Sequence, residues 1–104
     1  MADPVFEEIL IRNTADQKLT TIIAGQRCTF RFRYNPTTDR WSFDLRIGDR
    51  DVLFGRRVVP GADLLDPFKF GIGGLIAVPF DAPVADRSSL PERRIRVYSV
   101  QEAA

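Results

Sequence analysis

Residues 26–60 read QRCTFRFRYNPTTDRWSFDLRIGDRDVLFGRRVVP, and this stretch decides the fold. It contains two runs in which apolar and polar residues alternate. The apolar members are Cys28, Phe30, Phe32 and Tyr34 in the first run, and Trp41, Phe43, Leu45 and Ile47 in the second. Successive side chains on a strand point to opposite faces, so each run predicts a strand with one apolar and one polar face. Half-buried antiparallel strands have this pattern.

The two runs are separated by the turn-forming residues NPTTDR at 35–40, so they predict a β-hairpin. We place Tyr34 opposite Trp41, because a slip of one residue would turn one apolar row toward water. This register pairs the other members of the two rows: Phe32 with Phe43, Phe30 with Leu45 and Cys28 with Ile47. It also places Arg31 opposite Asp44 on the polar face. The two apolar rows are therefore the predicted structural core.

The pattern extends the hairpin into a three-stranded meander. Residues 48–51 (GDRD) predict a second turn, and a third strand is expected over 52–59. Its apolar face is expected to consist of Val52, Phe54 and Val58. Gly55 suits either a bulge or a close approach of another backbone, the two features that a glycine inside a strand often marks.

Further strands are expected at 5–12, 18–24, 75–80 and 94–100. The period of the first segment is ambiguous, so a short helix remains the alternative there. Residues 1–4 and 101–104 are expected to be loose termini. Six or seven short strands separated by turn signals predict an all-β protein, a small single-domain antiparallel barrel or sandwich over residues 1–104.

Composition narrows the class of protein. The chain has 104 residues, a net charge of +1 and 44% hydrophobic residues, which suits one globular domain with a modest core. No segment resembles a signal peptide or a membrane-spanning helix, so no membrane contact is expected. Cys28 is the single cysteine and lies in the apolar row, so we interpret it as a small buried hydrophobe rather than a reactive thiol.

The sequence contains no histidine, which removes the usual base of serine and cysteine nucleophiles. One cysteine without histidine cannot form a structural zinc site. Asp49 and Asp51 lack the spacing of a calcium loop, and Gly71–Gly74 is not followed by a helical pattern that would complete a phosphate site. We therefore predict no catalytic residue, no cofactor, no metal and no enzymatic activity.

Thirteen of the fifteen basic residues are arginine, a cation suited to protein interfaces, although a compositional bias of the genome would give the same count. The candidate partner contacts are Arg31, Arg33, Arg46, Arg56, Arg57, Phe68 and Phe70. Residues 81–92 form a long polar loop, which in a small domain is more often contact-making than idle. The alternative function is a small β-barrel that binds single-stranded nucleic acid or another ligand. Nucleic acid is disfavoured, because the aromatic residues lie on the face opposite the arginines and the net charge is near zero.

Residues 26–65 resemble the small baseplate plug proteins of contractile-tailed phages. The resemblance rests on TFRFRYN at 29–35, on Trp41 followed by Phe43-Asp44-Leu45, and on GRRVVPG at 55–61 followed by Leu64-Leu65. It implies a structural virion component at the centre of a tail baseplate, made in the bacterial host cytoplasm. Its implied partners are hub, spike or tube proteins, and a homo-oligomer remains open. The family supplies no catalytic residues.

Overall fold

The computed structural model describes residues 4–65 and 70–102. This part of the chain forms seven strands and no helix. The strands are β1 (Pro4–Ile9), β2 (Asp16–Ile23), β3 (Gln26–Asn35), β4 (Arg40–Ile47), β5 (Arg50–Arg57), β6 (Gly74–Pro79) and β7 (Ile95–Glu102). The predicted all-β class is confirmed. Within the described residues there is accordingly no helix that could cross a membrane.

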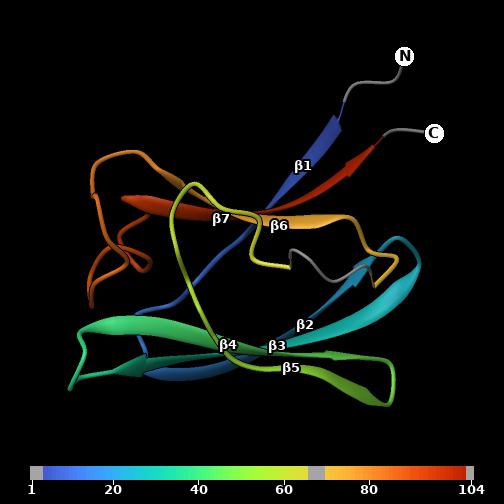
Figure 1. The fold of residues 1–104 in the computed structure, drawn as a ribbon, viewed down its shortest axis with the longest axis horizontal. Helices are drawn as coiled ribbons and strands as arrows, with labels where there is room; N and C mark the ends of the chain where they lie inside the picture. Colours follow the sequence, from blue (N-terminus) through green and yellow to red (C-terminus); the bar gives the residue numbers. More distant parts are fainter. Residues whose placement is uncertain (1–3, 66–69, 103–104) are drawn as a thin grey trace.

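The strands form two antiparallel sheets that lie one above the other (Figure 1). One has three strands in the order β1-β7-β6, and the other has four in the order β2-β3-β4-β5. The sheets do not close into a barrel, because no strand ladder joins them in the part of the chain that the structure describes. The chain passes between them twice, from β1 to β2 and from β5 to β6. The central meander β3-β4-β5 is therefore extended by β2 on one side.

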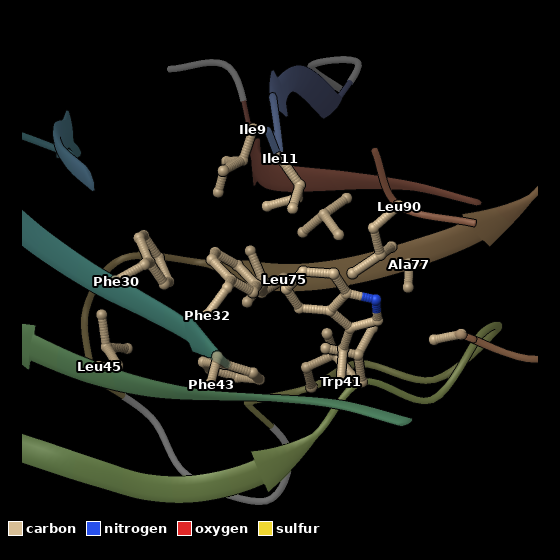
Figure 2. Close-up of a cluster of buried hydrophobic side chains, with 14 of the residues drawn as sticks. Ile9, Ile11, Phe30, Phe32, Trp41, Phe43, Leu45, Leu75, Ala77 and Leu90 are labelled. Carbon is tan, nitrogen blue, oxygen red and sulfur yellow. The ribbon is translucent and has the colours of Figure 1, made fainter. Parts of the chain in front are cut away.

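The β3–β4 register is the predicted one. Tyr34 pairs with Trp41, and the other apolar pairs follow in step. Phe30, Phe32 and Phe43 are fully buried, with ring centroids 5.8–6.2 Å apart. Figure 2 shows these rings facing Leu75 and residues of the other sheet. Large side chains that remove this much apolar area from water contribute roughly 1.5–3 kcal/mol each.

In β5, the residues that face the core are not all the ones that were predicted. Leu53 is buried opposite Leu45, whereas Phe54 is 72% exposed. The cause is two shifts in the β4–β5 register, one on each side of Leu45. An extra residue in one strand reverses the faces of everything after it. Val58 is buried as predicted, but it lies just beyond the end of the strand.

The ends of the chain also differ from the prediction. β1 ends at Ile9 instead of residue 12, because the chain turns there toward β2. Gln17 holds this turn: its side-chain oxygen accepts a hydrogen bond from the Arg12 amide at 2.8 Å, and its nitrogen donates to the Arg12 carbonyl. Residues 101 and 102 were expected in a loose tail but belong to β7. Pro4, likewise expected to be loose, begins β1.

Candidate functional site

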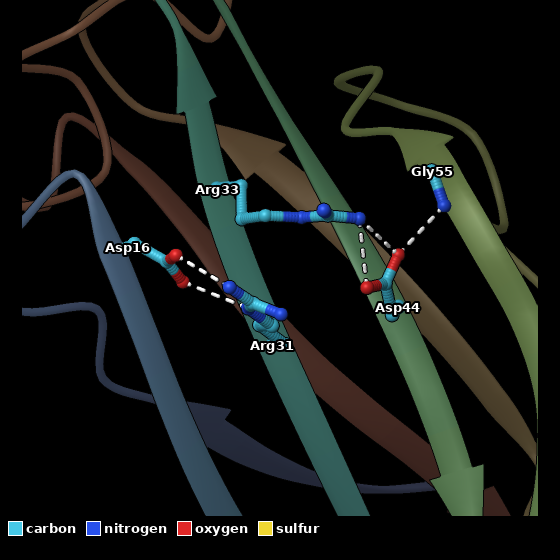
Figure 3. A network of polar contacts seen from close by, with 5 residues as sticks. All are labelled: Asp16, Arg31, Arg33, Asp44 and Gly55. Atoms are coloured by element: carbon cyan, nitrogen blue, oxygen red, sulfur yellow. Dashed lines mark hydrogen bonds and ion pairs between the residues drawn. The ribbon is translucent and has the colours of Figure 1, made fainter.

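The outer surface of the four-stranded sheet, which we call the polar face, carries most of the predicted contact arginines. Figure 3 shows their partners. Arg31 donates two hydrogen bonds to Asp16, at 2.9 and 2.7 Å, and Arg33 donates to both oxygens of Asp44 at 2.8 Å. Arg31 lies opposite Asp44 in the register as predicted, but it does not pair with it. Each arginine instead reaches a diagonal neighbour, which long side chains on adjacent strands can do.

Asp44 joins three strands of the polar face. Besides Arg33 on β3, it accepts a hydrogen bond from the backbone amide of Gly55 on β5 at 2.8 Å. Gly55 has a φ of +62°, the left-handed conformation that glycine adopts without strain. The bulge predicted at Gly55 is confirmed by the register shift beside it. Asp44 therefore ties the irregular part of β5 to the regular hairpin.

The charges on the polar face are largely neutralised by one another. The hydrogen bonds from Arg31 hold the pKa of Asp16 below its usual value and raise the pKa of Arg31. Arg46 makes a longer contact with Asp51, at 4.0 Å. Side chains in the Arg31–Asp16 and Arg46–Asp51 pairs are about half exposed, so the pairs contribute little to stability. Paired, solvated charges of this kind fix the orientation of one another's side chains.

The structure does not bring the predicted contact residues together in one patch. Arg56 and Arg57 lie on β5, at the edge of the sheet, where Arg56 is half-buried and Arg57 exposed. Phe70 packs against the core from the segment before β6. Phe68 lies outside the described residues. Arg31, Arg33 and Arg46 share the polar face with Arg57, which lies opposite Ser42 in the register.

A second cluster attaches the 81–92 loop to the β3–β4 hairpin. The indole nitrogen of Trp41 donates to the Asp86 carbonyl at 2.8 Å, and Arg87 lies 5.5 and 5.7 Å from the ring centres of Tyr34 and Trp41. The Tyr34 hydroxyl donates to Asp39, and this bond raises the pKa of Tyr34. The loop is thus held at one end of the molecule. Sequence reasoning missed this role of Arg87, although two aromatic residues beside the hairpin turn were a signal.

The loop also completes the core, which its polar composition did not suggest. Its buried members are Ala82, Ala85, Ser89 and Leu90. Ser89 is satisfied locally: its hydroxyl donates to the Asp86 carbonyl at 2.9 Å, and its amide donates to the Asp86 carboxylate. Much of the loop is therefore structural, and its exposed residues are presented on a fixed frame.

The outer surface of the three-stranded sheet is mostly apolar, in contrast to the polar face, although Glu8 and Arg96 also lie on it. We call this surface the apolar face; its residues are Phe6, Ile76, Val78, Tyr98 and Val100, all half-buried or exposed. The Phe6 and Tyr98 rings meet edge to face, with centres 6.2 Å apart. A sheet that is apolar on both faces is unusual for an antiparallel sheet with one face in water. Its sequence signal was the presence of apolar residues at both parities in residues 5–12 and 94–100.

The described residues contain no group of three or more acidic or cysteine side chains that could hold a metal ion. One surface depression lies on the polar face beside Lys18, Arg31 and Phe54. Cys28 is buried and unbonded to another cysteine, and burial raises the pKa of its thiol. A buried, protonated thiol is a poor nucleophile.

Comparison with known proteins identifies the family of this chain. Residues 6–102 match the family model described as "Cyanophage baseplate Pam3 plug gp18". The chain belongs to this family. The match extends well beyond the segment 26–65 on which the resemblance rested, and takes in β2 to β7 and most of β1. A search of the curated proteins finds no match. Membership of this family supports a structural role in a phage tail baseplate.

Proposed function

We propose that this plug protein is a non-enzymatic building block of a contractile tail baseplate, where it packs against hub, spike or tube proteins. The observation that carries the proposal is the family match over residues 6–102. The protein is made in the cytoplasm of the bacterial host and then incorporated into the tail.

The physical properties of the fold suit this role. A core built from three sides, by the two sheets and the 81–92 loop, leaves the outer surfaces available for contacts. These surfaces differ in character, one charged and internally paired, the other apolar. A building block seated among several neighbours uses such differences to distinguish them, because an apolar surface and a paired polar surface fit different partners.

The nucleic-acid alternative has little support in the surface chemistry. Arg31 and Arg33 are bound to aspartates, and the phenylalanine side chains that alternate with them along β3 point into the core. Binding to single strands needs a continuous basic groove with aromatic rings offered for stacking. Titration with an oligonucleotide at low salt should therefore give no saturable binding.

The proposed function is tested by removing the gene for this chain and complementing it. Without the chain, we expect tails that fail to assemble or lack a complete baseplate in electron micrographs. Complementation with wild-type protein should restore them. Phe43→Asp, which places a charge in the core, should not, whereas Phe54→Ala at an exposed position should. Normal, infectious tails in the absence of the chain would contradict the proposal.

A further inference from the structure

The four edges of the two sheets differ in what blocks them. β6 is covered by the chain that follows β5: Pro60 bridges to Ala77, and Asp63 bridges to Ile76. β5 is distorted by two register shifts, and bulges of this kind protect an edge strand from pairing with another chain. β2 carries Lys18 within the strand, another common protection. β1 is the remaining edge: it has Pro4 at its start and two glutamates, but within the described residues neither a bulge nor a covering segment.

β1 has a regular edge with no bulge. It pairs with β7 in unbroken register over six residues. The Phe80 amide donates to the Arg94 carbonyl, so the even-numbered residues of β7 turn their backbone groups toward β6. Bonded and non-bonded pairs alternate along an antiparallel ladder. The backbone groups of Phe6 and Glu8 therefore point away from β7, toward the edge where the described residues supply no further strand.

The end of this edge projects from the body of the molecule. Val5 and Phe6 point to opposite faces of β1, yet their exposed fractions are 49% and 52%. Figure 1 shows β1 and the C-terminal end of β7 running together away from the four-stranded sheet. We call these two segments the β1–β7 arm. From Phe6 to Ile9 the sheet is three-stranded, because β6 pairs with β7 as far as Val100; only Pro4 and Val5, opposite Glu102 and Gln101, form a two-stranded ribbon. Such a ribbon is marginally stable by itself, so a strand added along β1 would stabilise this end.

The charge of β1 indicates what kind of strand fits. β1 contains Glu7 and Glu8 and no basic residue. Glu8 is already bound by Arg93 at 2.6 Å, whereas Glu7 is exposed, and no ion pair of it occurs in the described residues. Opposite charges on paired strands attract, and like charges directly opposite each other are destabilising. A strand that places Lys or Arg opposite Glu7 complements this edge.

The same chemistry disfavours pairing of β1 with β1 of a second copy. A two-fold pairing centred on Glu7 would set two carboxylates directly opposite each other. A pairing centred on Phe6 would set Glu8 opposite Pro4, which has no amide to donate to the ladder. Both registers lose interactions that a different, basic strand would make.

We propose that the β1–β7 arm accepts a β-strand from a different baseplate protein, added at the open edge of β1. That strand carries an apolar residue against Phe6 and a Lys or Arg opposite Glu7. Backbone bonds to Phe6 and Glu8 supply affinity, and the side chains supply specificity, as in other cases of strand addition. This inference rests on the proposed function, because it takes the partner from the baseplate.

Amide hydrogen exchange compares the isolated protein with the protein in purified tail particles. We expect the amides of Phe6 and Glu8 to exchange about tenfold more slowly in particles than in the isolated protein, because new ladder bonds form at the open edge. Amides of β3, which are already paired on both sides, serve as the internal control. Unchanged exchange of Phe6 and Glu8 in particles that contain the chain would overturn the proposal and leave the proposed function standing.

A charge reversal tests the chemistry of the partner. Glu7→Lys should lower incorporation into particles about tenfold, because it places like charges together at the edge. Asp49→Lys makes the same change of net charge on the exposed β4–β5 turn and should incorporate normally. Equal incorporation of both variants would overturn the proposal. So would a concentration-dependent dimer of the isolated protein that Phe6→Asp abolishes, since the occupant would then be a second copy. Absence of wild-type protein from particles would overturn the proposed function together with this inference.

Discussion

At the scale of single residues, Trp41 connects the β3–β4 hairpin to the 81–92 loop, and both of these segments contribute to the core. Its ring is fully buried beside Tyr34, and its indole nitrogen binds the loop at Asp86. A buried aromatic ring that also donates a hydrogen bond contributes both packing and a fixed position for the loop.

Trp41→Ala should therefore lower the free energy of unfolding by about 3–5 kcal/mol, because it leaves a large cavity. Trp41→Phe keeps a ring and loses the hydrogen bond, so a smaller loss of about 1–3 kcal/mol is expected. Urea denaturation followed by circular dichroism measures both. Phe54→Ala, at a side chain that is 72% exposed, is the control and should change little. Equal stability of Trp41→Ala and wild type would show that the ring is not a core residue.

Glu8 makes stability depend on pH in the acid range. The two hydrogen bonds from Arg93, at 2.7 and 2.6 Å, hold the pKa of Glu8 below its usual value of 4.5. A carboxylate with a lowered pKa in the folded state adds stability above pH 4.5, and this is lost as the pH falls through the folded-state pKa. Wild type should therefore exceed Arg93→Gln in stability at pH 7 and lose that advantage toward pH 3.

Carbon-detected NMR titration of the Glu8 carboxyl follows the same effect directly. In wild type the midpoint should lie below 4.5, and in Arg93→Gln it should return toward that value. High salt should reduce the difference, because the Arg93 side chain is about half exposed. A Glu8 midpoint that is identical in the two proteins would contradict this account.

At the scale of elements, the bulged strand β5 depends on two supports, the left-handed backbone at Gly55 and the carboxylate of Asp44. No atom lies within 4 Å of the position that a side-chain carbon would take at Gly55, so a substitution there tests the backbone alone. A substitution at Asp44 tests the contribution of the polar contact.

Gly55→Ala should cost about 1–2 kcal/mol, because a residue with a side chain is strained in the left-handed region. Gly55→Asn should cost less, since asparagine tolerates this conformation better. Thermal unfolding of the two variants beside wild type provides the comparison. A more stable Gly55→Ala protein would mean that the strand does not need the bulge.

Asp44→Ala should lower the free energy of unfolding by about 1–2 kcal/mol, because it removes bonds from Arg33 and from the Gly55 amide at a site that is only 20% exposed. Asp16→Ala removes a similar arginine pair at a well-exposed site and should have little effect on stability. The two variants are measured by urea denaturation in the same buffer. An equal loss in both would contradict the distinction drawn between them.

At the scale of the whole molecule, strict alternation made the β3–β4 hairpin predictable, since only one register buries both apolar rows. β5 was not predictable in detail, because nothing in the sequence shows which residue of a bulge is extra. The partner of Arg31 is on β2, so it depends on how that strand pairs with β3, and the alternation within the β3–β4 hairpin does not determine this. The open edge of β1 follows from the order of strands in a sheet, and that order joins residues at opposite ends of the chain.

The central claim is that this β-sheet protein is a fixed component of a tail baseplate. Mass spectrometry of purified tails, with isotope-labelled peptides of this chain and of known baseplate proteins as standards, tests it most directly. We predict that the chain is present in a constant ratio to the baseplate proteins through successive gradient steps. Its absence from intact, infectious particles, or a ratio that falls with each step, would contradict the claim.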